Sequence, residues 1–123
     1  MQLRPVTSLI ARNAYRTVSG IRLFHYASSC VTSGRGCPVF TGAVRPNHAG
    51  KLVEFVLQRR TGTRWKAAGS ARFRLGRLSQ QTVFLHYRSA TARTGLWRTR
   101  LHFFADSDHV AADSAWLTFR ITT

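Results

Sequence analysis

Apolar and polar residues alternate in short runs along most of the chain, and Gly, Pro, Asn or Ser separate these runs. Successive side chains of a β-strand point to opposite faces, so the alternation indicates strands with one buried face. No window keeps the spacing of an amphipathic helix between a helix start and a helix stop. The strand-like runs are residues 8–11, 20–27, 38–44, 51–60, 64–69, 71–76, 81–88, 96–105 and 114–121. The pattern therefore predicts an all-β fold, an antiparallel β-sandwich.

The last two runs predict a hairpin that closes around the segment DSDHVAAD, residues 106–113. Pairing Phe104 with Ser114 sets a register in which the two strands have matching faces. The predicted inner face consists of Trp97, Thr99, Leu101, Phe103, Ala115, Leu117, Phe119 and Ile121. The predicted outer face consists of Arg98, Arg100, His102, Trp116, Thr118 and Arg120. We expect the inner face to lie in the core and the outer face to contact solvent.

Residues 52–58 predict another strand with one apolar face. Its predicted inward side chains are Val53, Phe55 and Leu57, and its outward ones are Glu54, Val56 and Gln58. Gly62 predicts the turn that follows, because glycine adopts a positive φ at little cost. Trp65 begins the next strand, and the size of its side chain favours a place in the core.

The charge balance adds a second feature to the predicted sandwich. The chain has 123 residues, a length that suits a single domain. It contains seventeen Arg and two Lys but only four acidic residues, which gives a formal net charge of +15. Such a chain is attracted to DNA, RNA, anionic cell-wall polymers and acidic lipid surfaces, and salt weakens each attraction. Arginine also fills surface positions for compositional reasons alone. Both interpretations stay open, because net charge speaks to partners and not to fold.

The N-terminal segment, residues 1–29, contains Arg and Ser and has no acidic residue. That composition is typical of a mitochondrial transit peptide, although its apolar residues suit edge strands equally well. The segment after Met1 lacks the long apolar core and the small-residue cleavage site of a secretory signal. No run in the chain approaches the roughly 20 apolar residues that span a membrane. We therefore expect no transmembrane segment.

Two longer segments carry a resemblance to a known family. They are VFTGAVRPNHAGKLVEFVLQRRTGTRWKAAGSARF, residues 39–73, and GLWRTRLHFFADSDHVAADSAWLTFRI, residues 95–121. In order they contain TGAVRP, an HAG turn, LQRR, a Gly-containing turn that leads to Trp, GLWRTR, an acidic ADSDH loop and a final strand that begins at Ser. This outline resembles the immunoglobulin-like or fibronectin type III-like repeats of secreted actinobacterial proteins.

The resemblance implies an immunoglobulin-like antiparallel β-sandwich of about seven strands. Residues 39–123 are then the sandwich core, and residues 1–38 form N-terminal strands and a Cys-pinned loop of the same domain. The implied function is that of a non-catalytic structural or binding module in an exported or cell-surface bacterial protein. Neighbouring domains, like subunits or a cell-envelope glycan are the implied partners. Fold analogy alone does not choose among these roles.

Cys30 and Cys37 flank VTSGRG, a short loop that allows their Cα atoms to come within disulfide distance. Two nearby cysteines in a loop-rich β chain favour a structural disulfide and an oxidising compartment. The alternatives are two free thiols, or a zinc site with His25 and His48 as further ligands. The cysteine spacing is wider than in common zinc motifs, which argues against zinc.

The acidic segment ADSDH offers oxygen ligands at alternate positions, Asp106 and Asp108, which are weak calcium candidates. Asp and Ser in a hairpin loop also bond their own backbone, so we favour a loop without metal. This segment, with His109 and the later Asp113, is where any acid–base chemistry would have to start. Motifs of the GxSxG, GxxxxGK and GxGxxG types are missing, so we expect no enzyme and no cofactor. His48, His86 and His102 are expected at the surface or the rim.

The outer face of the last predicted hairpin is the best candidate for a binding surface. An aromatic ring there stacks a sugar or a base while guanidinium groups bind anionic oxygens. The candidate residues are Arg98, Arg100, Trp116, Arg120 and His102, and Arg72 and Arg74 repeat the device on another strand. The simpler interpretation is a solvated face with Trp116 covered by a neighbouring domain or by residues 1–38.

Three functional hypotheses follow from these patterns. The first is a non-catalytic module of an exported protein that binds an anionic polymer or a glycan. The alternative is a nucleic-acid-associated protein, such as an organellar ribosomal component, whose arginines bind RNA phosphates and whose N-terminus is a targeting segment. An enzyme ranks third, because the chain has only four carboxylate side chains.

Overall fold

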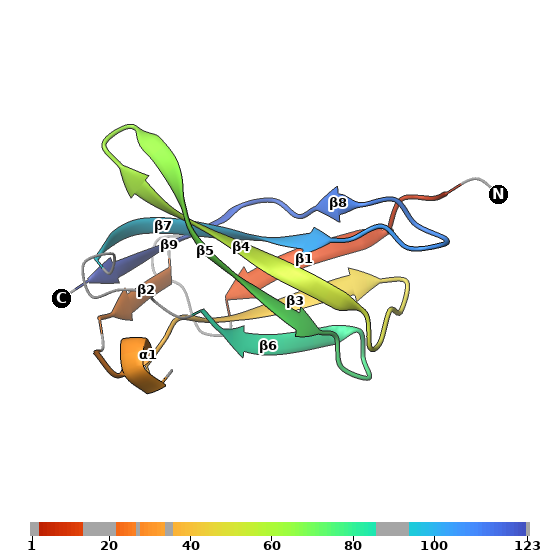
Figure 1. The fold of residues 1–123 in the computed structure, drawn as a ribbon, viewed down its shortest axis with the longest axis horizontal. Coiled ribbons are helices and arrows are strands. Elements are labelled where there is room, and N and C mark those ends of the chain that lie inside the picture. Colours follow the sequence, from red (N-terminus) through yellow and green to blue (C-terminus); the bar gives the residue numbers. More distant parts are fainter. Residues whose placement is uncertain (1–2, 14–21, 27, 34–35, 86–93, 123) are drawn as a thin grey trace.

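The computed structural model describes residues 3–13, 22–26, 28–33, 36–85 and 94–122. Their strands form two sheets that pack face to face, so the predicted all-β sandwich is confirmed (Figure 1). The strands are β1 (Ser8–Asn13), β2 (Arg22–His25), β3 (Val39–Arg45), β4 (Leu52–Thr61), β5 (Arg64–Arg74), β6 (Gln80–Phe84), β7 (Gly95–Phe103), β8 (Ala112–Asp113) and β9 (Leu117–Thr122). A short helix of six residues, α1 (Ser28–Ser33), lies between β2 and β3. No helix among the described residues is long and apolar enough to cross a membrane.

The smaller sheet has the strand order β1-β3-β6, and the larger one has the order β2-β9-β7-β4-β5. The two-residue strand β8 pairs with the far end of β7, beyond β9. The pairing is antiparallel, as predicted, except that β2 runs parallel to β9. The N-terminal third of the chain therefore contributes to both sheets, because β1 pairs with β3 and β2 pairs with β9.

The core lies between the two sheets and is rich in aromatic side chains. Phe119 of β9 is fully buried, and its ring centroid lies 4.9 Å from that of Phe40 in β3. Trp97 of β7 also stacks on Phe119, with ring centroids 6.3 Å apart. Val53, Phe55 and Leu57 of β4 are buried, as are Trp97, Thr99, Leu101 and Phe103 of β7. The alternation therefore assigned the inner faces of both strands correctly, since period-two geometry leaves each side chain only one face.

Gly42 of β3 lies in close contact with side chains of the opposite sheet. A Cβ atom added there would lie 3.1 Å from both Cδ atoms of Leu101 and 3.2 Å from Cζ of Phe73. These distances are shorter than ordinary van der Waals contact, so a larger side chain would push the two sheets apart.

The predicted register of the last hairpin is wrong by two residues. Trp97 pairs with Phe119, whereas pairing Phe104 with Ser114 would place it opposite Ile121. Three residues, 114–116, lie opposite two, because β8 pairs in one register and β9 in another. Ser114 is held at this irregularity by the Leu101 N–H, which donates to Ser114 Oγ at 2.9 Å. Ala115 is consequently exposed rather than inward, while the even shift leaves the faces of β9 as predicted.

The runs 64–69 and 71–76 were expected to be two strands, but they form the one long strand β5. A β-bulge interrupts its pairing with β4, because Leu57 pairs with Gly69 whereas Gln58 pairs with Ala67. Ala68 is the extra residue, so the face to which odd-numbered residues of β5 point changes there. The hairpin of β4 and β5 extends beyond the rest of the sandwich (Figure 1).

Cys30 of α1 and Cys37, just before β3, form a disulfide with a Cα–Cα distance of 4.8 Å. Both residues belong to the hydrophobic core cluster. The predicted disulfide is confirmed, and since it uses both cysteines of the chain it leaves no thiolate for a zinc site.

Candidate functional site

A stack of alternating arginine and tryptophan side chains lies on the outer face of the larger sheet. The guanidinium carbon of Arg98 in β7 lies 4.5 Å from the ring centroid of Trp65 and 4.0 Å from that of Trp116. Trp116 also contacts a second cation, because the guanidinium carbon of Arg100 lies 4.2 Å from its ring centroid. Arg60 of β4 lies 5.7 Å from the Trp65 ring. We call these five residues the Arg–Trp stack.

Four segments of the chain bring the Arg–Trp stack together. Arg60 pairs with Trp65 across the hairpin of β4 and β5, and Arg98 pairs with Gln58 of β4. Trp116 stands in the irregular segment just before β9 and lies over the arginines of β7. The stack thus spans neighbouring strands of the sheet and also runs along β7 from Arg98 to Arg100, because outward residues of paired strands come side by side.

Polar contacts orient the two arginines of β7 in the stack. Arg98 Nε donates a hydrogen bond to Gln58 Oε1 at 2.8 Å. Arg100 Nε is buried and forms an ion pair with Asp113 Oδ1 at 3.7 Å, which is too long for a hydrogen bond. Burial lowers the pKa of Arg98 below its ordinary value, and the charges of Arg100 and Arg60 lower it further. An arginine nevertheless stays charged in a protein, so the stack is a row of permanent cations.

The outer face of the larger sheet also holds a hydrogen bond and an ion pair next to the stack. His102 Nδ1 lies 2.8 Å from Asp113 Oδ1, so Asp113 joins both His102 and Arg100. On the other side, Arg72 Nε lies 2.8 Å from Glu54 Oε2. Half of the four carboxylates of the chain therefore neutralise arginines on this one face.

The structure brings together four of the five candidate binding residues, Arg98, Arg100, His102 and Trp116. Arg120 is exposed on β9, and within the described ranges it has no recorded ion pair or ring contact. Arg74 donates to the backbone oxygen of Gly50 at 3.0 Å, away from the stack. Arg120 and Arg74 therefore add charge but do not belong to the organised site.

Trp65 was expected in the core, and this prediction is wrong. Its side chain is half-buried on the outer face, stacked against Arg98. Alternation along β5 would put Trp65 on the same face as Phe73, but the bulge at Ala68 reverses the alternation between them. The tight turn at Gly62 carried the missing signal: it pairs Arg60 with Trp65, and Arg60 points outward together with Glu54 and Gln58.

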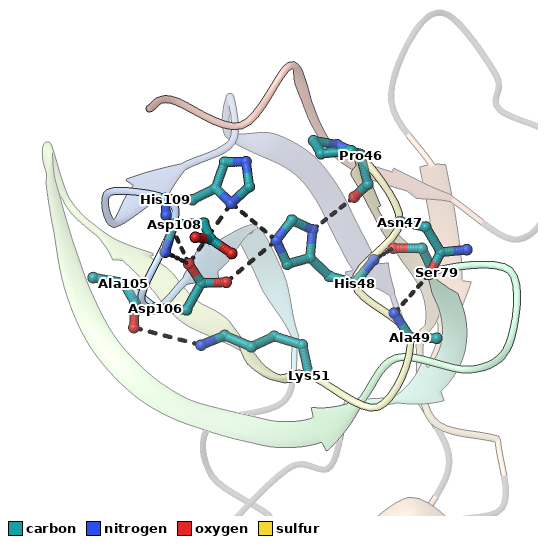
Figure 2. Close-up of polar contacts among 10 residues, drawn as sticks. All are labelled: Pro46, Asn47, His48, Ala49, Lys51, Ser79, Ala105, Asp106, Asp108 and His109. Atoms are coloured by element: carbon teal, nitrogen blue, oxygen red, sulfur yellow. Dashed lines mark hydrogen bonds and ion pairs between the residues drawn. The ribbon is translucent and has the colours of Figure 1, made fainter. Parts of the chain in front are cut away.

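A second group of polar side chains lies at one end of the sandwich, where the β3–β4 and β7–β8 loops meet (Figure 2). It joins His48, Asp106 and His109, which we call the His–Asp cluster. His48 is in a turn as predicted, but its side chain is only 10% exposed. Asp108 belongs to the same loop without being a member, and it bonds Asp106 through its backbone N–H.

The Asp106 carboxylate is held in its ionised form by the loop itself. Its Oδ1 accepts hydrogen bonds from the backbone N–H groups of Asp108 at 2.8 Å and of His109 at 2.7 Å. The bond from Asp108 is the main cause that lowers the pKa of Asp106 below its ordinary value, and partial burial opposes this shift. The predicted bonding of the acidic segment to its own backbone is therefore confirmed. His25 and His86 lie outside the residues whose side chains the structure describes.

No protein-family model matches this chain, and no curated protein matches it significantly.

Proposed function

We propose that this chain is a non-catalytic, immunoglobulin-like module of an exported or cell-surface bacterial protein, and that its Arg–Trp stack binds an anionic glycan or cell-envelope polymer. The observation that carries the proposal is the stack, because it organises three arginines and two tryptophans on one sheet face. A net charge of +15 draws a polyanion to the chain, and the stack is where it would be bound in a defined geometry.

The strand order supports the immunoglobulin-like assignment. In such sandwiches strands A, B and E form one sheet, and strands G, F and C, followed by C′ in variable-type domains, form the other. The orders β1-β3-β6 and β9-β7-β4-β5 follow these two patterns when the strands are taken in chain order. The parallel strand β2 and the helix α1 are then insertions between the first two strands of the pattern.

The disulfide supports an exported protein. Disulfides persist in oxidising compartments and are rare where thiol reductants are abundant. The bond between Cys30 and Cys37 is buried in the core cluster, which gives it a structural place in the fold. Such a bond is less expected in a mitochondrial or cytosolic RNA-binding protein, because thiol reductants are abundant there.

The chemistry of the stack suits anionic oxygens. The guanidinium carbon of Arg98 lies over two indole rings and its Nε donates to Gln58, so the N–H groups of its two terminal nitrogens are the ones left for an anion. In-plane N–H groups are the ones that bind sulfate, carboxylate or phosphate oxygens in a fork. The half-buried rings of Trp65 and Trp116 add apolar surface on which a sugar ring stacks.

The test is a binding titration with two polyanions, heparin as an anionic glycan and single-stranded RNA, at low salt and at about 150 mM salt. The variant is Arg98→Gln with Arg100→Gln, and the control is Arg12→Gln with Arg77→Gln. Both pairs remove two positive charges, but Arg12 and Arg77 are exposed on the side of the smaller sheet. We expect the stack variant to bind heparin about tenfold more weakly than the control at the higher salt concentration.

Two outcomes would contradict the proposal. If both double variants weaken binding equally, the attraction is one of net charge alone and no site exists on the outer face. If RNA binds more tightly than heparin, with the larger loss in the stack variant, the same face is a nucleic-acid site and the alternative hypothesis replaces ours.

A further inference from the structure

The His–Asp cluster brings three metal-ligating side chains from two loops to one point. His48 comes from the loop between β3 and β4, whereas Asp106 and His109 come from the loop between β7 and β8 (Figure 2). His48 Nε2 lies 3.3 Å from Asp106 Oδ2 and 3.3 Å from His109 Nδ1. His109 Nδ1 lies 3.6 Å from Asp106 Oδ1, and one donor atom from each residue falls within 4.8 Å of the others.

These separations match the edges of a metal coordination sphere. In a tetrahedral zinc site with ligands at about 2.0–2.1 Å, two ligand atoms are about 3.3–3.4 Å apart. Both separations from His48 Nε2 are 3.3 Å, and the separation of His109 Nδ1 from the nearer Asp106 oxygen is only slightly longer. The carboxylate presents Oδ2 to His48 and Oδ1 to His109, so two imidazole nitrogens and one oxygen of this carboxylate form the donor set, and one donor atom from each residue lies within 4.8 Å of the others.

The proton arrangement leaves the inward atoms of the cluster available as ligands. The Pro46 carbonyl oxygen lies 2.6 Å from His48 Nδ1 and is able only to accept, so Nδ1 carries the proton and Nε2 keeps its lone pair in the neutral ring. Asp106 uses Oδ1 for two backbone N–H groups, and its Oδ2 faces His48. A backbone carbonyl on the far nitrogen of a histidine is the usual outer support of a metal-binding imidazole.

Packing holds the rings in this orientation. The His48 ring stands edge to face against Phe103, with centroids 5.1 Å apart, and edge to face against His109 at 4.8 Å. The His48 backbone N–H donates to Ser79 Oγ at 2.8 Å. The side chains of His48 and His109 are 10% and 15% exposed, whereas that of Asp106 is 25% exposed. The cluster is thus rigid and mostly buried, with its solvent access on the side of the carboxylate.

We propose that the His–Asp cluster is a binding site for a divalent transition-metal ion, zinc in the first place. Two imidazole nitrogens and one carboxylate oxygen are a donor set for Zn²⁺ and its first-row neighbours, whereas Ca²⁺ takes oxygen ligands alone. The calcium candidates Asp106 and Asp108 are revised accordingly, since the second aspartate is replaced by two histidines. Among the described residues no fourth His, Cys, Asp or Glu joins the group, so one position remains for water or a ligand from another molecule.

This site is independent of the proposed polyanion binding, because it lies on loops and shares no residue with the Arg–Trp stack. A metal ion bound there would link the β3–β4 loop to the β7–β8 loop. It would therefore stabilise the folded chain, since these ligands come together only on folding.

The test uses the full chain, freed of metal with a chelator and titrated with ZnCl₂, CoCl₂ and CaCl₂. Zn²⁺ should bind with a stoichiometry of one and raise the Tm. Co²⁺ should give the intense visible absorption of a four-coordinate ion, and Ca²⁺ should have no effect at the same concentration. His109→Gln and Asp106→Asn should each weaken Zn²⁺ binding about a hundredfold or more.

The matched control is His102→Gln, which removes a histidine that is also bonded to an aspartate but lies on the outer sheet face. It should bind one Zn²⁺ as the wild type does. Absence of Zn²⁺ binding by the wild type at about 100 µM would overturn the proposal, as would equal losses in His102→Gln and His109→Gln. Circular dichroism of the metal-free variants identifies any that fail to fold, and the Co²⁺ spectrum of the wild type decides the matter without them.

Discussion

The two faces of β7 differ sharply, although their residues alternate along a single strand of nine residues. Its inner side chains are closed in by Phe119, Val53 and their neighbours, and Trp97, Leu101 and Phe103 are at most 1% exposed. Of its outer side chains, Arg98 lies 4.5 and 4.0 Å from the ring centroids of Trp65 and Trp116, and Arg100 lies 4.2 Å from that of Trp116. One strand therefore stabilises the fold with its inner residues and presents an ordered cationic surface with its outer residues.

The largest effect is expected from removing an aromatic ring on the inner side. Phe119→Ala should lower the free energy of unfolding by about 3–5 kcal/mol, because the fully buried ring contacts Phe40, Phe24 and Trp97. Thr118→Ala, one residue away on the outer side, should change it by no more than about 0.5 kcal/mol. Urea denaturation of both variants measures the difference, and similar losses would erase the distinction between the two faces.

A smaller loss should follow from overfilling the space between the sheets at Gly42. Gly42→Val should cost about 1–3 kcal/mol, since its side chain would meet Leu101 and Phe73 at less than ordinary contact distance. Gly42→Ala should cost less than the valine, because the atoms it meets are the ends of movable side chains. Thermal unfolding of the pair measures the gradation, and a stabilising valine would show that the sheets are not in close contact there.

On the outer side, Trp116→Leu should cost about 1–2 kcal/mol, which is the loss of two cation–π contacts with partial compensation by leucine. A double-mutant cycle with Arg98→Gln should give a coupling energy of about 0.5–1 kcal/mol. Denaturant titrations of the four proteins in the cycle supply the numbers. Zero coupling would mean that the stack is a geometric coincidence and not an energetic unit.

The smallest effect on stability is expected for Arg120→Gln, within about 0.5 kcal/mol, because this exposed side chain lies outside the Arg–Trp stack. Its effect on heparin binding should equal that of Arg77→Gln as a single substitution, because each removes one charge that acts at long range. A larger loss, measured in the same salt titration, would extend the binding surface onto β9.

The faces of single strands were predictable from the sequence, whereas the register between strands was not. Val53, Phe55 and Leu57 follow period-two alternation, which depends only on the local backbone. The predicted register of the last hairpin differs from that of β8 by three residues, and the extra residue among 114–116 reduces the difference to two for β9, which leaves the inward pattern of β9 unchanged. The error of an even number of residues was therefore invisible to the hydrophobic pattern.

The candidate sites show the same division. Arg98, Arg100 and Trp116 were found because they alternate with core residues on neighbouring runs. The His–Asp cluster was missed, since His48 and His109 are 61 residues apart and come together only when two loops meet at one end of the sandwich. No local pattern marks such a meeting, because it depends on how the two sheets are stacked.

The sequence by itself determined the all-β class, the inner and outer faces of β4 and β7 and the strongly basic composition, and it favoured the Cys30–Cys37 disulfide over free thiols and zinc. Each of these follows from alternation, short spacing or composition, which are local properties of the chain. Only the tertiary structure decided that Trp65 points outward into the Arg–Trp stack and that His48 meets Asp106 and His109. Both depend on strand pairing: a single extra residue at Ala68 reverses a face, and the order of the strands sets which loops become neighbours.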